Sequence, residues 1–156
     1  MKRLFSIPFM LLICFFLCTI CVTANAQSDY YTRQAESYMR DAEYYNKQAA
    51  GYERDAEYYN KKAAGYERDA EYYNRQAQGY MRDAEYYTRQ QDYDKASTRT
   101  RWAKDASEKA QTRMRWAVDS REKARTRMKW AQEAREKART RMKWAQEAME
   151  KARKSQ

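Results

Sequence analysis

The stretch EYYNKQAAGYERDA at residues 43–56 is followed without a gap by EYYNKKAAGYERDA at 57–70 and by EYYNRQAQGYMRDA at 71–84. Each unit spans two heptads, so an alanine returns once per heptad and a tyrosine follows each alanine by three positions. A small residue and an aromatic residue at heptad positions a and d predict a helix that packs along its whole length against another helix. The predicted packing seam of this first repeat comprises Ala49, Ala56, Ala63, Ala70, Ala77, Tyr52, Tyr59 and Tyr66.

A different unit of two heptads fills the second half of the chain, as in TRMKWAQEAREKAR at residues 126–139 and TRMKWAQEAMEKAR at 140–153. Alanine again returns once per heptad, but tryptophan and methionine replace tyrosine as the large apolar residues. The same heptad argument predicts a second long helix. Its predicted packing seam comprises Ala117, Ala124, Ala131, Ala138 and Ala145.

The two repeats predict an all-α protein with helices at residues 27–90 and 98–154, joined by residues 91–97. The alanine spacing slips across the join, because the step from Ala84 to Ala96 is not a whole number of heptads. In one continuous helix this slip would rotate the second seam by about 120° from the first. The chain therefore either folds back into an antiparallel helical hairpin or coiled coil, or forms one long rod with two seams. Candidate N-caps for the second helix are Asp92, Asp94, Ser97 and Thr98.

Charge favours the fold-back over the rod. Residues 27–92 carry 10 basic and 13 acidic side chains, whereas residues 93–156 carry 20 basic and 9 acidic ones. An acidic helix and a basic helix of similar length are expected to pair, either within one chain or between chains.

A second stripe lies beside the first seam, at heptad position c. Large and small residues alternate along it in the order Tyr44, Gly51, Tyr58, Gly65, Tyr72, Gly79 and Tyr86. A glycine inside a helix costs about 0.5–1 kcal/mol relative to alanine. Two interpretations fit: a tyrosine of a neighbouring helix, offset by one heptad, lies over each glycine, or the glycines are incidental products of repeat duplication.

The N-terminal stretch, residues 1–26, has the features of a secretory signal peptide. Lys2 and Arg3 precede an apolar run over residues 5–22, and Ala24-Asn25-Ala26 supplies a small-x-small cleavage pattern. We therefore expect cleavage after Ala26 and a secreted or extracellular protein, periplasmic in a bacterium; an uncleaved membrane anchor is the alternative. All three cysteines fall in this segment, so the mature chain is expected to have neither disulfides nor thiol chemistry.

The composition after this segment predicts a non-enzymatic protein without cofactor, metal or small-molecule substrate. The chain has no histidine, and it shows no Gly-rich phosphate loop and no metal-ligand spacing. The basic second repeat predicts a candidate site for anionic polysaccharide or lipid headgroups, at Arg113, Arg115, Trp116, Arg127, Trp130, Arg141 and Trp144. The alternative is that these charges face the acidic helix and solvent, and the expected export argues against nucleic acid as a partner.

The leading functional expectation is a structural or scaffolding role through self-association along the seams, as a homo-oligomer. The alternatives are a module that docks on anionic surfaces, a stress-protective polymer that is disordered until it forms helix, and a matrix protein cross-linked through its tyrosines. The alanine seam resembles that of alanine-zipper envelope lipoproteins, which carry a lipidated cysteine. The segment EKARTRMKWAQEA is similar to group 3 late-embryogenesis-abundant proteins, which have an 11-residue repeat and few aromatic residues. Neither resemblance carries a function over to this chain.

Overall fold

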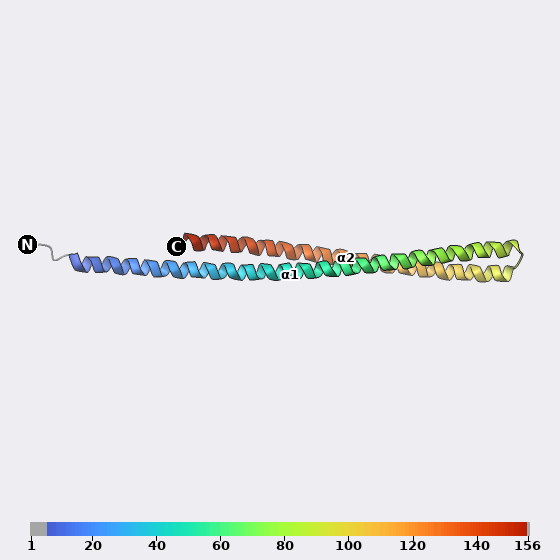
Figure 1. Cartoon of the computed structure of the whole chain (residues 1–156), viewed down its shortest axis with the longest axis horizontal. Coiled ribbons are helices and arrows are strands. Elements are labelled where there is room, and N and C mark those ends of the chain that lie inside the picture. Colours follow the sequence, from blue (N-terminus) through green and yellow to red (C-terminus); the bar gives the residue numbers. More distant parts are fainter. Residues whose placement is uncertain (1–5, 156) are drawn as a thin grey trace, which may run out of the picture. The chain divides into compact units, whose positions relative to one another are not determined.

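Two long helices make up the fold of the computed structural model, which describes the backbone of residues 6–155 and the side chains of residues 26–155 (Figure 1). Helix α1 spans Ser6–Arg89 and helix α2 spans Tyr93–Lys154, and the described residues contain no strand. The helices pack against each other, which confirms the prediction of an all-helical chain of two long helices. The predicted signal peptide, residues 1–26, lies outside the residues with described side chains, except for Ala26.

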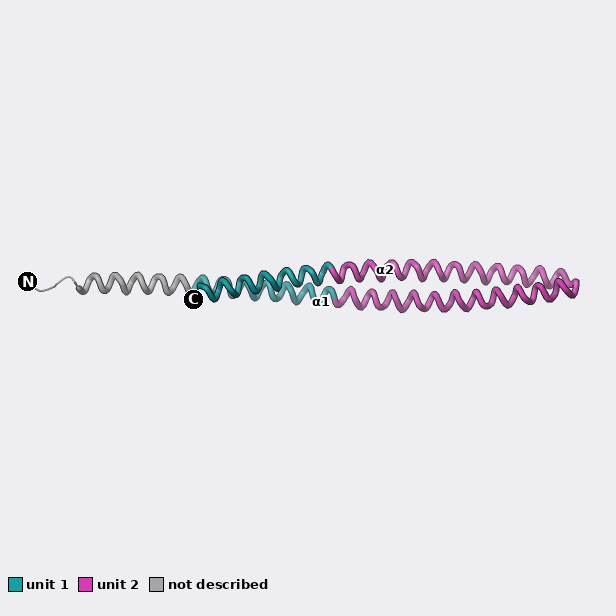
Figure 2. Tube along the Cα trace, turned by 90° about the horizontal axis from the view of Figure 1, so that it is seen from above, with its two compact units in different colours: residues 1–49, 133–156 teal, residues 50–132 magenta. Residues whose placement is uncertain are grey.

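The chain divides into two compact units, each built from one stretch of α1 and one stretch of α2 (Figure 2). In the unit formed by residues 1–49 and 133–156, Tyr38 contacts Trp144 and Tyr31 contacts Lys151. The partner of Tyr31, seven residues before Tyr38 on α1, is thus Lys151, seven residues after Trp144 on α2. The two stretches are therefore antiparallel.

The unit formed by residues 50–132 is a helical hairpin that contains the turn between α1 and α2. Tyr52 contacts Trp130 and Tyr66 contacts Trp116, so its helices are also antiparallel. Within this unit the chain folds back, as the opposite charges of the two repeats predicted.

The buried hydrophobic residues of the described chain are all alanines. Methyl groups on both helices allow the two backbones to approach closely, so the core is a narrow line of small side chains. Nine of the ten alanines predicted for the two seams are buried, with 1–2% of their surface exposed: Ala49, Ala56, Ala63, Ala70, Ala117, Ala124, Ala131, Ala138 and Ala145. The seam tyrosines Tyr52, Tyr59 and Tyr66 are half-buried.

Ala77 is the one predicted seam alanine that is only half-buried. It lines an open groove of about 620 Å³ together with Met81, Ala103 and Ser107. The residue that corresponds to Ser107 in the next copy of the repeat is Arg121, a long side chain that reaches α1 and contacts Glu67 at 2.7 Å. Ser107 is too short to make the equivalent contact, and Ala77 in the same groove is only half-buried.

The turn between the helices is closed by a Schellman motif without glycine. Gln91 has a φ of 61° in the left-handed region. Its N–H donates to the carbonyl of Thr88, and the N–H of Asp92 donates to the carbonyl of Tyr87, both at 3.0 Å. These two bonds satisfy carbonyls at the end of α1 that have no partner within the helix.

Asp92 also begins the second helix. Its carboxylate accepts a hydrogen bond from the Lys95 N–H at 3.2 Å, which is the bond that an N-cap forms with the third helical residue. Asp92 is one of the four N-caps that the sequence suggested, and α2 accordingly begins at Tyr93, within the stretch 91–97 predicted as the join. The helix thus starts earlier than the predicted residue 98, because the acid nearest the end of α1 acts as the cap.

Gln91→Gly is expected to raise the free energy of unfolding by about 1 kcal/mol. The left-handed conformation costs a residue with a Cβ roughly 1–2 kcal/mol, part of which glycine loses again through its greater freedom in the unfolded chain. Urea denaturation followed by circular dichroism measures the change. Gln91→Ala is the control, since alanine meets the same backbone penalty, and an equal gain from both substitutions would contradict this explanation.

The contribution of Asp92 to the stability of the folded chain is expected to disappear at acidic pH. The Lys95 ammonium and N–H, both hydrogen-bonded to the carboxylate, lower the pKa of Asp92. Because this pKa is lower in the folded than in the unfolded chain, the stabilisation is present above the unfolded pKa and is lost as pH falls through the folded one. Asp92→Asn keeps a capping oxygen that does not titrate. Melting temperatures from pH 7 to pH 2 should converge for the wild type and Asp92→Ala, while Asp92→Asn changes less with pH.

Candidate functional site: the repeated interhelical contacts

One cluster of four side chains joins α1 to α2 and shows how the helices recognise each other. The rings of Tyr52 and Trp130 meet edge to face, with centroids 5.5 Å apart and planes at 62°. The Arg127 guanidinium lies 4.6 Å from the Trp130 ring centroid, and its Nε lies 3.6 Å from Oδ2 of Asp55. The cluster thus combines an aromatic pair and an ion pair between the two helices with a cation–π contact within α2.

The spacing of residues within each helix places the two side chains that it contributes to this cluster next to each other. Tyr52 and Asp55 are three residues apart on α1, and Arg127 and Trp130 are three residues apart on α2. Residues at this spacing lie on one face of a helix, so each helix presents an aromatic ring beside a charge. Antiparallel packing then brings tyrosine to tryptophan and aspartate to arginine.

The same cluster occurs four times, because both repeats have the same length of two heptads. The ring centroids lie 5.4–5.6 Å apart and the ion pairs measure 3.6–3.8 Å. The four tyrosine, tryptophan, arginine and aspartate sets are Tyr38, Trp144, Arg141, Asp41; Tyr52, Trp130, Arg127, Asp55; Tyr66, Trp116, Arg113, Asp69; and Tyr80, Trp102, Arg99, Asp83.

The tyrosines between these clusters contact lysines of α2 instead of tryptophans. Lys109 Nζ lies 5.8 Å from the centre of the Tyr73 ring, and Lys137 Nζ lies at the same distance from Tyr45. The seam tyrosines therefore alternate along α1 between a tryptophan partner and a lysine partner. This alternation restricts the register to steps of two heptads, although the alanines alone repeat with every heptad.

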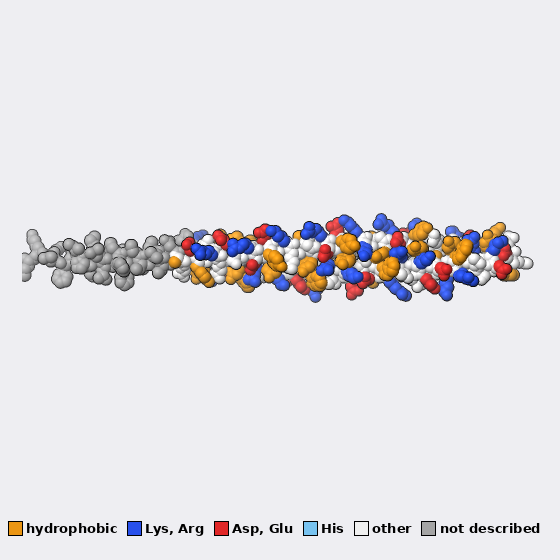
Figure 3. All heavy atoms as spheres, turned by 90° about the horizontal axis from the view of Figure 1, so that it is seen from below, with side chains coloured by type: hydrophobic (Ala, Val, Ile, Leu, Met, Phe, Trp, Pro, Cys, Tyr) orange, Lys and Arg blue, Asp and Glu red, His pale blue; other side chains and the backbone are white. Residues whose placement is uncertain are grey.

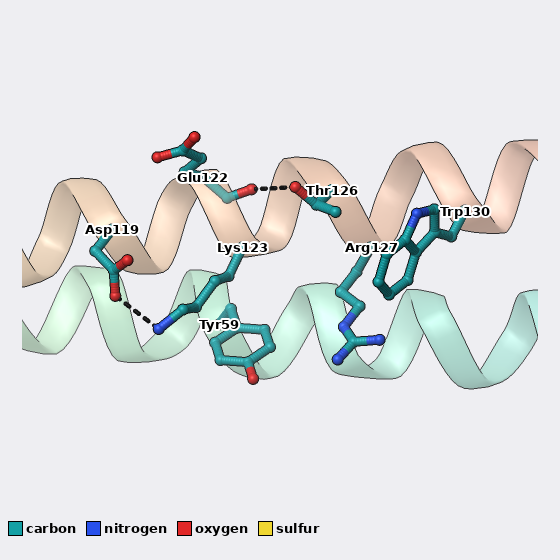
Figure 4. Close-up of a pocket in the computed structure, with 7 residues that line it drawn as sticks. All are labelled: Tyr59, Asp119, Glu122, Lys123, Thr126, Arg127 and Trp130. Carbon is teal, nitrogen blue, oxygen red and sulfur yellow. Dashed lines mark hydrogen bonds and ion pairs between the residues drawn. The ribbon is translucent and has the colours of Figure 1, made fainter.

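An open groove of about 440 Å³ lies beside the cluster at Trp130 (Figure 4). Tyr59 of α1 lies beneath the Lys123 side chain, and Arg127 extends alongside Trp130. Lys123 Nζ lies 2.8 Å from Oδ2 of Asp119, and this hydrogen bond raises the pKa of Lys123.

This groove offers balanced charge and recurs along the helices. Its charged lining residues are two acids and two bases: Asp119, Glu122, Lys123 and Arg127. Grooves with equivalent linings lie at Trp144 and Trp116. Because each groove carries its own counter-ions, its lining does not favour ligands of one charge.

The residues predicted to bind anions are largely engaged with α1. Arg113, Arg127 and Arg141 contact Asp69, Asp55 and Asp41, respectively, and each also stacks on its tryptophan. Arg115 is exposed, and Trp116, Trp130 and Trp144 keep 40–45% of their surface exposed. These contacts favour the alternative in which the arginine charges face the acidic helix.

Sequence reasoning missed the partners of these arginines. Asp41, Asp55, Asp69 and Asp83 contribute to the acidic charge of the first repeat, and this charge alone indicates no particular contact for them. A signal was present, since aspartate follows every second seam tyrosine by three positions and arginine precedes every tryptophan by three.

No family model matches this chain, and neither a curated protein nor a solved structure matches it. Within the described part of the chain, no group of acidic, cysteine or histidine side chains could hold a metal ion. Among the described residues, no helical stretch combines the length and the apolar character of a membrane span.

Proposed function

We propose that the protein is a non-enzymatic structural protein, an antiparallel coiled-coil hairpin that acts by associating with further copies of itself. The observation that carries this proposal is a set of large aromatic side chains that the packing of α1 on α2 leaves uncovered. Exposed tyrosines recur once per repeat on α1, with 54–62% of their surface open: Tyr30, Tyr44, Tyr58, Tyr72 and Tyr86.

The exposed tyrosines differ from the seam tyrosines by one position in the sequence. Tyr58 and Tyr59 pack edge to face at 5.4 Å, but Tyr59 lines a groove with residues of α2 whereas Tyr58 is 59% exposed. The hydrophobic side chains on one face of the molecule lie in separate groups among charged ones (Figure 3). Such groups suit contacts that repeat along a surface, and apolar surface left open by the single chain supports association.

The repetition of the internal contacts supports a structural role over a single binding site. Four equivalent clusters hold the two helices together, one for each copy of the repeat. A chain extended by duplicating such a unit gains length and contact surface with each copy. We infer export as part of the same proposal, from the signal-peptide pattern at residues 1–26.

Sedimentation equilibrium over a hundredfold concentration range tests self-association. We expect the weight-average mass to rise above that of one chain while circular dichroism shows a helical spectrum throughout. A helical chain that stays at the mass of one copy at every concentration would defeat the proposal. A random-coil spectrum would favour the stress-protective polymer.

Expression of the full chain in an export-competent host tests the inferred export. We expect the protein outside the cytoplasm with Gln27 as its first residue, because cleavage should follow Ala26. N-terminal sequencing of the exported protein measures this. Retention of residues 1–26 on a membrane-bound product would indicate the uncleaved anchor instead.

A further inference from the structure

An uncovered stripe of alternating tyrosine and glycine runs along α1 in the unit formed by residues 50–132. Tyr58, Tyr72 and Tyr86 are 54–59% exposed. Three glycines alternate with these tyrosines: Gly51, Gly65 and Gly79. A Cβ atom added to any of them would meet no neighbouring side chain within 4 Å. The stripe therefore consists of three large side chains and three open pits, spaced one heptad apart.

Helix α2 does not fill these pits. The sequence suggested that a tyrosine of a neighbouring helix covers each glycine, and the only neighbouring helix in the described hairpin packs on the alanine seam instead. Glycine, which destabilises a helix by about 0.5–1 kcal/mol relative to alanine, thus recurs three times without a packing role in the single chain.

We propose that this stripe, Gly51 to Tyr86, is the interface with a second copy of the chain, in which each tyrosine of one copy lies over a glycine of the other. The inference rests on the proposed function, because it names the surface through which the hairpins associate. The stripe is complementary to itself: large and small residues alternate with every heptad, so a shift of one heptad places rings opposite pits. Close packing of large against small side chains is what makes a helix interface specific.

The charges beside the stripe select a parallel arrangement of the two copies. Arg68 and Asp69 lie between Gly65 and Tyr72 on opposite sides of the stripe, because they stand three and four positions after the glycine. One side is entirely basic and comprises Arg54, Lys61, Arg68, Arg75, Arg82 and Arg89. The other side carries Asp55, Asp69 and Asp83, which also contact arginines of α2 but keep 52–53% of their side-chain surface exposed, alternating with Lys62, Gln76 and Gln90.

When two copies of this helix face each other in parallel, the basic side of each lies against the aspartate side of the other. When they run antiparallel, basic side lies against basic side and aspartate side against aspartate side. A parallel pair therefore sets the basic row of each copy beside the aspartates of the other. An antiparallel pair would set basic row against basic row, and like charges in register repel.

A matched pair of double variants tests the interface in the full chain. Gly51→Gln with Gly65→Gln fills two pits with a neutral residue that favours helix, and the open space around each glycine leaves room for it within the single chain. The control is Ala50→Gln with Ala64→Gln, which places the same residue one position earlier, at exposed sites outside the stripe. A later copy of the repeat already carries a glutamine there, Gln78.

We expect the glycine variant to remain helical and to self-associate at least about tenfold more weakly than the wild type in sedimentation equilibrium, while the control associates as the wild type does. Equal association of both variants would overturn the interface but leave the proposed function standing. A wild-type chain that remains a single copy would instead defeat the proposed function itself. The two failures are therefore distinguishable.

A photo-reactive benzoylphenylalanine in place of Arg54 tests the direction of the pair. In the parallel arrangement it should cross-link to the second copy within about one heptad of its own position. In an antiparallel pair with tyrosines over glycines, Arg54 would lie near Arg82 of the partner's basic row, so cross-links there would overturn the parallel assignment. Mass spectrometry of the cross-linked dimer identifies the peptide.

Discussion

Ala63→Leu is expected to lower the free energy of unfolding by about 1–3 kcal/mol, because the methyl group of Ala63 leaves almost no surface exposed between the two helices. A leucine adds three carbons where the backbones lie close together, so the helices must separate locally or the side chain must adopt a strained rotamer. Separation would also pull apart the aromatic and charged contacts on either side. Urea denaturation at a concentration where the chain is a single copy measures the loss.

The neighbouring residue supplies the control for this experiment. Ala64 is exposed, and Ala64→Leu introduces the same side chain into the same helix one position later. Since alanine and leucine are both strong helix formers, we expect this variant to unfold within about 0.5 kcal/mol of the wild type. Similar losses for both substitutions would mean that the alanine seam is not the tightly packed contact between the helices.

Trp130→Ala is expected to destabilise the hairpin by about 2–3 kcal/mol. The indole is 40% exposed, so the loss should fall below the roughly 3–5 kcal/mol typical of a fully buried tryptophan. The substitution removes the ring contact with Tyr52 and the surface on which Arg127 stacks. Chemical denaturation gives the stability, and tryptophan fluorescence is then confined to the remaining three indoles.

A double-mutant cycle with Tyr52→Ala separates the ring contact from the general loss of apolar surface. We expect a coupling energy of about 0.5–1.5 kcal/mol between Tyr52 and Trp130, the range found for edge-to-face aromatic pairs. Tyr58→Ala serves as the matched control, because Tyr58 lies on the outer stripe and should show no coupling to Trp130. A coupling near zero for Tyr52 would show that the alanines alone align the helices.

The outcome for individual residues shows how far sequence reasoning reached. The burial of Ala56 and Ala124 was predictable, because heptad spacing decides which face of a helix is covered before any partner is known. The partial exposure of Ala77 was not predictable from the same spacing, since it lies in a groove that Ala77 shares with Ser107 of the other helix. The spacing around Arg127 did not indicate Asp55 as a partner, because Asp55 lies on the other helix and in the other repeat.

The turn illustrates the same division between local and distant information. Asp92 was identifiable as a cap from its residue type, because the capping bond is local. The left-handed backbone of Gln91 was not, since glutamine has no particular preference for that conformation and is held there by the two hydrogen bonds that close the helix end.

The sequence by itself determined that this protein forms two long helices, that each has an alanine face, and that the two carry opposite net charge. All of these follow from residue types at fixed spacing along one helix. Only the tertiary structure decided which tyrosine meets which tryptophan, that the arginines are held by aspartates of the other helix, and that the Tyr–Gly stripe stays uncovered. The physical reason is that alanines repeating with every heptad allow many registers of equal packing. The aromatic and charged contacts, which repeat only with every second heptad and need both helices to be present, restrict these registers to steps of two heptads.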